Sequence, residues 1–97
     1  MGIIKNRKEE YTMSNLLKET IEIIEENGLT EKDIEWVGTT ELYFSFEHFK
    51  KIANVEYDSG YGSPKVAGDL LVVGKDWWLE RHEYDGSEWW ECKKVIE

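Results

Sequence analysis

The sequence predicts an α+β domain in which two helices pack on one face of an antiparallel sheet of about five strands. Three observations predict this fold. Two segments in the first half repeat apolar residues at helical spacing, the last third alternates polar and apolar residues, and Asp85-Gly86 is a strong signal for a two-residue hairpin turn. The expected order is a helix, a hairpin, a second helix, a long loop and a three-stranded meander.

The first helix is expected to begin after Ser14, as its N-cap, and to run to Asn27. Asn27-Gly28 is a typical helix stop, because both residues tolerate a left-handed backbone. Glutamates occupy the side of the helix that is opposite its apolar stripe. The stripe consists of Leu17, Ile21 and Ile24.

A β-hairpin is expected next, from residues 34–37 and 42–46, which alternate in polarity on either side of Gly38. In the second strand, period-two alternation would place Leu42, Phe44 and Phe46 on one face.

Ser45 is a typical N-cap for a second, short helix. Residues 54–68 follow as the longest irregular stretch, and their glycines, proline and tyrosines indicate an ordered, folded-back loop. The inner side of the second helix is expected to consist of Phe46, Phe49, Ile52 and Ala53.

The last third is expected to form a meander whose first strand, residues 70–73, is apolar on both faces as a central strand would be. Each later strand contains a tryptophan pair, Trp77-Trp78 or Trp89-Trp90. Because neighbouring side chains of a strand point to opposite faces, one tryptophan of each pair belongs in the helix-covered core. The other needs a cover, which would be the tyrosine-rich loop, a second subunit or a partner.

Two registers remain open for the last hairpin. A two-residue turn would place Arg81 opposite Trp90, a stacking or cation–π contact, while a three-residue loop would pair Arg81 with Glu91. The two-residue register has a cost, because like charges then oppose each other across the strands. The opposed pairs are Glu83 with Glu88 and Glu80 with Glu91.

The chain has 21 acidic and 12 basic residues, a formal net charge of −9. This excess repels phosphate, so we expect no direct binding of nucleic acid or anionic membranes and favour a basic protein as partner. No apolar stretch is long enough for a signal peptide or a membrane span. Cys92 is the only cysteine, which fits a reducing cytoplasm.

Residues 1–12 are interpreted as a flexible leader before a single domain at 13–97. A purine-rich ribosome-binding sequence could encode Lys8-Glu9-Glu10, which would place the natural translation start at Met13. The alternative is a flexible native terminus.

No enzymatic, metal or cofactor site is expected. Glu80 and His82 are two residues apart on one strand, but this arrangement arises often by chance and no nucleophile accompanies it. The histidines and the lone cysteine lack the spacing of zinc ligands. Gly60 and Gly62 lack the Gly-Lys-Ser/Thr ending of a phosphate-binding loop.

Residues 55–62, 69–74 and above all 77–91, Trp-Trp-Leu-Glu-Arg-His-Glu-Tyr-Asp-Gly-Ser-Glu-Trp-Trp-Glu, carry a resemblance that covers roughly residues 29–96. The chain resembles a family of small proteins from phages, prophages and other mobile elements of Gram-positive bacteria. No catalytic or binding residues are carried over from it. The resemblance implies a context in which small acidic proteins such as anti-CRISPR proteins inhibit host defence.

The expected function is therefore inhibition of a host nucleic-acid-handling protein, such as a Cas nuclease, by an acidic protein that mimics DNA. The alternatives are a structural or accessory phage protein that self-associates as a homodimer, and a small-molecule-binding module that uses residues 57–64. The residues expected to contact the partner are Asp58, Tyr61, Trp78, Glu80, Glu83, Asp85, Glu88, Trp89 and Glu91.

Overall fold

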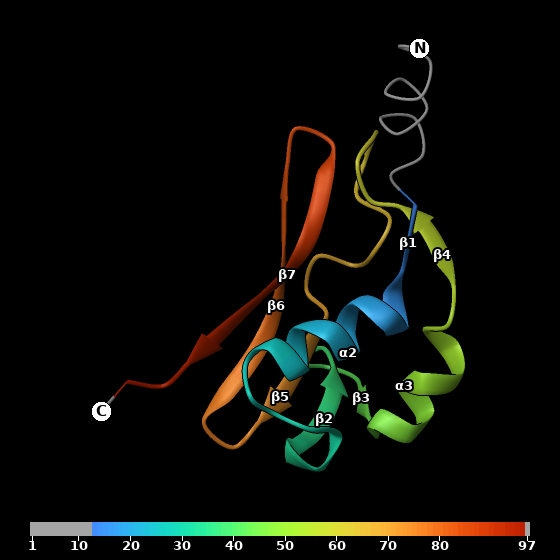
Figure 1. The fold of residues 1–97 in the computed structure, drawn as a ribbon. Coiled ribbons are helices and arrows are strands. Elements are labelled where there is room, and N and C mark those ends of the chain that lie inside the picture. The colour runs from blue at the N-terminus through green and yellow to red at the C-terminus, as the bar shows by residue number, and fades with distance from the viewer. Residues whose placement is uncertain (1–12, 97) are drawn as a thin grey trace.

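The computed structural model describes residues 13–96, and the interpretation of residues 1–12 as a leader lies outside this range. The described chain forms a five-stranded antiparallel sheet, a separate two-stranded sheet and two α-helices (Figure 1). This arrangement confirms the predicted α+β fold. The elements are β1 Met13–Asn15, α2 Leu16–Glu26, the 3₁₀ turn η1 Glu31–Asp33, β2 Ile34–Gly38, β3 Tyr43–Phe44, α3 Phe46–Ile52, β4 Glu56–Asp58, β5 Leu71–Gly74, β6 Trp77–Tyr84 and β7 Ser87–Lys94.

The start of α2 differs from the prediction by one residue. Asn15 is the N-cap, because its side-chain oxygen accepts the backbone N–H of Lys18 at 3.0 Å. Ser14 lies in β1 instead, where its hydroxyl is 2.8 Å from the hydroxyl of Ser59. The predicted helix stop is confirmed, since Gly28 follows the helix with a φ of 74°.

The two-stranded sheet of β1 and β4 is absent from the sequence prediction. β4 lies within residues 54–68, which were expected to be irregular, and pairs antiparallel with β1 so that Ser14 is opposite Tyr57. Tyr57 is buried and belongs to the hydrophobic core. The small sheet therefore holds the start of α2 against the chain that follows α3.

The β2–β3 hairpin is confirmed, but its second strand has only two residues. Leu42 is still part of the turn, where its backbone exchanges hydrogen bonds with Thr39, and its side chain is 71% exposed. Gly38 has a φ of 142° and approaches the chain so closely that a Cβ would lie 2.3 Å from the Leu42 carbonyl oxygen. The expected face of Leu42, Phe44 and Phe46 is therefore wrong, because Phe46 begins α3.

α3 begins as predicted, with the hydroxyl of Ser45 accepting a backbone N–H 3.1 Å away. Phe46, Phe49 and Ala53 are buried. Ile52 was expected beside them but is 51% exposed, because the helix ends at this residue and Ala53 turns inward.

The large sheet has the strand order β3-β2-β5-β6-β7, so β5 is its central strand, as predicted. Asp85 and Gly86 form the two-residue turn of the last hairpin with φ values of 50° and 89°. This turn places Arg81 opposite Trp90 and excludes the three-residue alternative.

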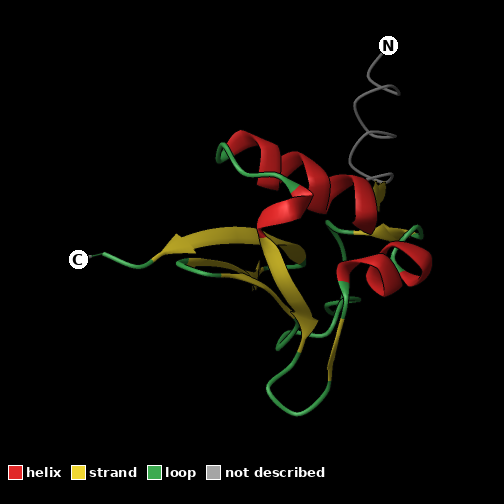
Figure 2. Cartoon of the chain, turned by 90° about the horizontal axis from the view of Figure 1, so that it is seen from below, coloured by secondary structure: helices red, strands yellow, loops and turns green. Residues whose placement is uncertain are grey.

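Both helices pack on the same face of the large sheet (Figure 2). Trp77 and Trp90 are buried on this core face, where the indole N–H of Trp90 donates to the hydroxyl of Thr20 on α2 at 2.8 Å. Trp78 and Trp89 point to the opposite face and are half-buried. The prediction that one tryptophan of each pair lies in the core is confirmed.

Candidate functional site

A buried ion pair anchors the β6–β7 hairpin, which carries most of the predicted site residues. The guanidinium of Arg81, with 3% of its side chain exposed, lies 2.9 Å from a carboxylate oxygen of Glu88 and donates to the phenol oxygen of Tyr57 at 3.0 Å. It also lies 3.5 Å from a carboxylate oxygen of Glu19 on α2 and 4.8 Å from the ring centre of Trp90. These contacts connect β6 and β7 to β4 and α2.

The prediction that Glu88 contacts a partner needs correction, because its side chain is only 3% exposed. Its carboxylate accepts the backbone N–H groups of Lys65 at 2.5 Å and Val66 at 3.1 Å. Glu88 thus holds the loop between β4 and β5 on the core side of β7. These hydrogen bonds place the loop on the face opposite Trp89. The loop therefore does not cover the outward tryptophans, which was one of the three expected covers.

The helix-free face of β6 and β7 brings together four of the predicted site residues. We call it the aromatic–acidic face, and it is flanked by Leu71 and Val73 of β5 through the strand pairing. Tyr43 and Trp36 extend the aromatic surface toward β2 and β3, with ring centres 5.3 Å apart. The residues of the aromatic–acidic face are Trp78, Glu80, His82, Trp89, Glu91 and Lys93.

Each outward tryptophan is fixed by the carboxylate two residues further along its strand. The indole N–H of Trp78 donates to Glu80 at 2.7 Å, and that of Trp89 donates to Glu91 at 3.0 Å. These hydrogen bonds are the main cause that lowers the pKa of both carboxyl groups, and His82 contributes at Glu80. Both carboxylates therefore carry their charge throughout the neutral pH range.

His82 lies between these two carboxylates. Its Nε2 is 2.6 Å from an oxygen of Glu80 and 3.4 Å from an oxygen of Glu91, and its ring stacks on Trp89 with centres 6.5 Å apart. Lys93 neutralises part of the charge, since its ammonium is 3.2 Å from Glu91. The strands thus hold an ordered array of rings and charges.

The remaining predicted site residues lie at the tip of the same hairpin. Glu83 and Asp85 are exposed there, and Tyr61 of the neighbouring loop is 75% exposed. The loop and the turn touch, because a Cβ on Gly86 would lie 3.4–3.5 Å from backbone atoms of residues 60–62. Asp58 stabilises the loop by accepting the backbone N–H of Gly60 at 3.0 Å.

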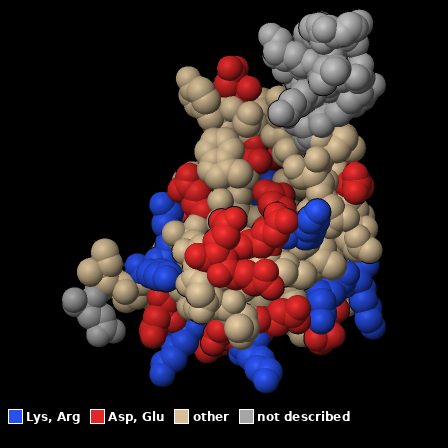
Figure 3. All heavy atoms as spheres, viewed as in Figure 1, with Lys and Arg blue, Asp and Glu red and all other residues tan. Residues whose placement is uncertain are grey.

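An acidic surface on α2 was not among the predicted site residues. Figure 3 shows Asp and Glu side chains gathered over this helix on the side opposite the aromatic–acidic face. Its last turn contains Glu25 and Glu26 and no basic residue, although the carbonyl end of a helix favours cations. The signal in the sequence is the run of glutamates at helical spacing, which also fits an ordinary solvated helix face.

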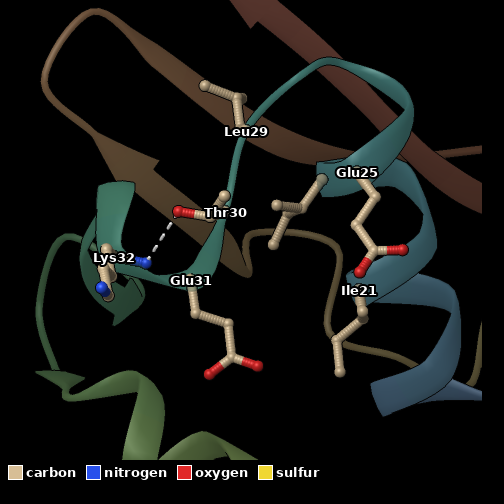
Figure 4. A pocket seen from close by; sticks show the side chains of 7 residues that line it. Ile21, Glu25, Leu29, Thr30, Glu31 and Lys32 are labelled. Carbon is tan, nitrogen blue, oxygen red and sulfur yellow. Dashed lines mark hydrogen bonds between the residues drawn. The ribbon is translucent and has the colours of Figure 1, made fainter.

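An apolar groove of about 450 Å³ separates the second half of α2 from the chain around η1 (Figure 4). Its apolar lining comes from Ile21, Ile24 and Leu29, and charged side chains such as Glu25 and Lys32 also line it. Its lining residues include no histidine or cysteine, and the Thr30 hydroxyl donates to the Asp33 carboxylate at 3.2 Å as part of the cap of η1.

The described residues contain no group of three or more His, Cys, Asp or Glu side chains placed to hold a metal ion. Burial raises the pKa of the Cys92 thiol, so it is protonated at neutral pH and is a poor nucleophile. Of the helices in residues 13–96, none is long and apolar enough to cross a membrane.

No protein-family model, curated protein or solved structure matches the chain. The case for a function therefore depends on the surfaces of the molecule itself, above all on the aromatic–acidic face.

Proposed function

We propose that this protein is a non-enzymatic interaction module that covers a basic, nucleic-acid-binding surface of another protein and so acts as a DNA mimic. The partner in this proposal is a host nucleic-acid-handling protein such as an RNA-guided Cas nuclease, which makes the protein anti-CRISPR-like. The observation that carries the proposal is the aromatic–acidic face, where two half-buried tryptophans and two ionised carboxylates stand on a sheet surface without a helix.

Tryptophan is enriched among the residues that dominate protein interfaces, because a large rigid ring buries much area at little entropic cost. Trp78 and Trp89 are already held by hydrogen bonds to Glu80 and Glu91. Binding a partner would therefore cost little side-chain conformational entropy at these two residues. Each carboxylate uses one oxygen for the indole, and the other contacts His82 in Glu80 and Lys93 in Glu91. Planar carboxylates on a rigid support suit the guanidinium groups of an arginine-rich surface.

The charge of the whole chain supports a basic partner. A net charge of −9 attracts a cationic surface over a distance and repels nucleic acid. Because nucleic acid is attracted to the same cationic surface, the protein and the nucleic acid would compete for one site on the partner. The acidic surface on α2 adds to this attraction from the other side of the molecule.

The direct test uses a guide-loaded Cas nuclease and a labelled DNA duplex that contains its target. We expect the protein to lower DNA binding, measured by fluorescence anisotropy, and to lose affinity as salt rises because the interaction is between exposed charges. Replacing both carboxylates in Glu80→Gln/Glu91→Gln keeps the indole acceptors. It should weaken binding about 30- to 150-fold, since two charge-assisted contacts of about 1–1.5 kcal/mol each are lost.

The matched control is Glu41→Gln/Glu47→Gln, which changes the net charge equally at exposed positions away from the face. It should change binding only slightly. Equal loss in both double variants would show that net charge alone matters and would remove the aromatic–acidic face from the proposal. Tight binding of the protein to DNA itself at physiological salt would refute the mimicry.

A further inference from the structure

The outer edge of β7 carries backbone groups without partners in the described chain. In an antiparallel hairpin with a two-residue turn, the odd-numbered residues of β7 exchange hydrogen bonds with β6 and the even-numbered ones point their N–H and C=O outward. Glu88 follows this pattern, since its N–H donates to the carbonyl of Ser59 at 2.9 Å. Among residues 13–96, no partner is placed against the outward N–H groups of Trp90, Cys92 and Lys94.

This open segment is paired with residues 77–81 of β6 on its other side, and Figure 1 shows no element beyond its outer edge. An unpaired edge strand is a template for another strand. Ser59 closes the edge at Glu88, so an added strand would have to centre further along β7, between Trp90 and Lys94.

We propose that this edge pairs with the same edge of a second copy of the chain, antiparallel about a twofold axis at Cys92. The reason is that the sequence on either side of Cys92 is complementary to itself. Glu91 would lie opposite Lys93 of the second copy, and Lys93 opposite its Glu91, both on the aromatic–acidic face. On the core face, Trp90 would lie opposite Lys94 of the second copy.

Neighbouring registers lack this complementarity. Moving the axis to residue 91 places Glu91 against its own copy, and moving it to residue 93 places Lys93 against its own copy. Lysines on an edge strand usually prevent pairing because they repel each other. In the register centred on Cys92, Lys93 faces the Glu91 carboxylate of the second copy instead, so this lysine favours pairing.

The register also fits the backbone. Residues 90, 92 and 94 all point outward, so Cys92 would form a hydrogen-bonded pair with its copy, and Trp90 would form one with Lys94. The Cα atoms of the two Cys92 residues would be about 5.5 Å apart. The inference does not depend on the proposed function, because backbone groups of the edge make the pairing and self-association tests it. It shares only Glu91 and Lys93 with the aromatic–acidic face.

Charge reversal tests the register. Sedimentation velocity on the full chain should show a concentration-dependent dimer, and Glu91→Lys and Lys93→Glu should each weaken it at least tenfold by opposing like charges. An equimolar mixture of the two single variants should restore dimers, because every opposed pair is then complementary. The double variant Glu91→Lys/Lys93→Glu should restore them as well. Far-UV circular dichroism confirms that each variant folds.

A second measurement locates the axis. Cys92 is the only cysteine, so a short bismaleimide can join two chains only at this position. At alkaline pH, which offsets the raised pKa of this thiol, the wild-type chain should cross-link and Lys93→Glu should not. The proposal is overturned by a wild-type chain that remains monomeric at millimolar concentration, or by a dimer that persists unchanged in both single variants.

Discussion

Removing the Glu88 carboxylate should cost this protein a large part of its stability. In Glu88→Ala, the guanidinium of Arg81 stays buried at 3% exposure and loses its nearest counter-ion, which was 2.9 Å away. Breaking a buried ion pair in this way costs about 3–5 kcal/mol. The backbone N–H groups of Lys65 and Val66 also lose their acceptor, although this loop can turn toward water.

A domain of this size is stable by about 5–15 kcal/mol, so the loss is about a fifth of the total or more. At about 4–8 °C per kcal/mol, it should lower Tm by at least 12 °C. Urea unfolding followed by tryptophan fluorescence measures the change, with Trp90 as a reporter 4.8 Å from the guanidinium.

The matched control is Glu83→Ala, directly across the ladder from Glu88 but exposed. Removing this carboxylate should change stability by less than about 0.5 kcal/mol. If Glu88→Ala were as mild as Glu83→Ala, the buried pair would contribute nothing that water or the other contacts of Arg81 could not replace. The reasoning from burial would then be refuted.

Three further outcomes follow from individual contacts. Asn15→Ala should lose about 1 kcal/mol of stability in urea unfolding because the cap of α2 disappears. Asn15→Asp keeps the accepting oxygen and loses only the exposed bond to Asn54, so it should lose less. Trp90→Phe should lose about 1–3 kcal/mol by breaking the buried bond to the α2 hydroxyl, and Trp89→Phe, at the half-buried position, should lose less than 1 kcal/mol in the same assay. Burial, and then the bond to a carboxylate, raise the pKa of Tyr57 from 10.0 to about 12, so the folded state holds this proton more tightly than the unfolded state. The corresponding stability is complete below pH 10 and is lost as the pH rises to 12, so urea midpoints should fall over this window more steeply in the wild type than in Tyr57→Phe.

Local chemistry made the last hairpin predictable. Asp85-Gly86 indicates a two-residue turn, but the like charges that this turn opposes left the three-residue register open, and only the structure places Arg81 opposite Trp90. The sequence also indicated like charges at Glu83 and Glu88. The structure shows why this is tolerated: Glu88 turns into the core toward Arg81, and only Glu83 remains in solvent.

Long-range contacts were not predictable in this way. β1 and β4 have three residues each and pair across a large part of the chain, so neither has a periodic pattern of its own. Ser14 has the chemistry of an N-cap, but pairing with β4 draws it into a strand and leaves the cap to Asn15. Likewise, nothing near Arg81 in the sequence indicates Tyr57 and Glu19 as its partners, because they arrive from β4 and α2.

Because each of the last two strands contains two adjacent tryptophans, the buried ion pair helps to fix the strand register as well as to stabilise the fold. Slipping a strand by one residue normally exposes its apolar side chains, and this penalty fixes the register. Here a slip of β7 would exchange Trp90 for Trp89 in the core, so the apolar pattern discriminates poorly between the two registers. The same slip would move Glu88 to the open face and leave the Arg81 charge in the core without this carboxylate. Breaking the buried pair in this way costs several kcal/mol. The ion pair, together with the turn at residues 85–86, therefore decides which tryptophan faces outward, and with it the composition of the aromatic–acidic face.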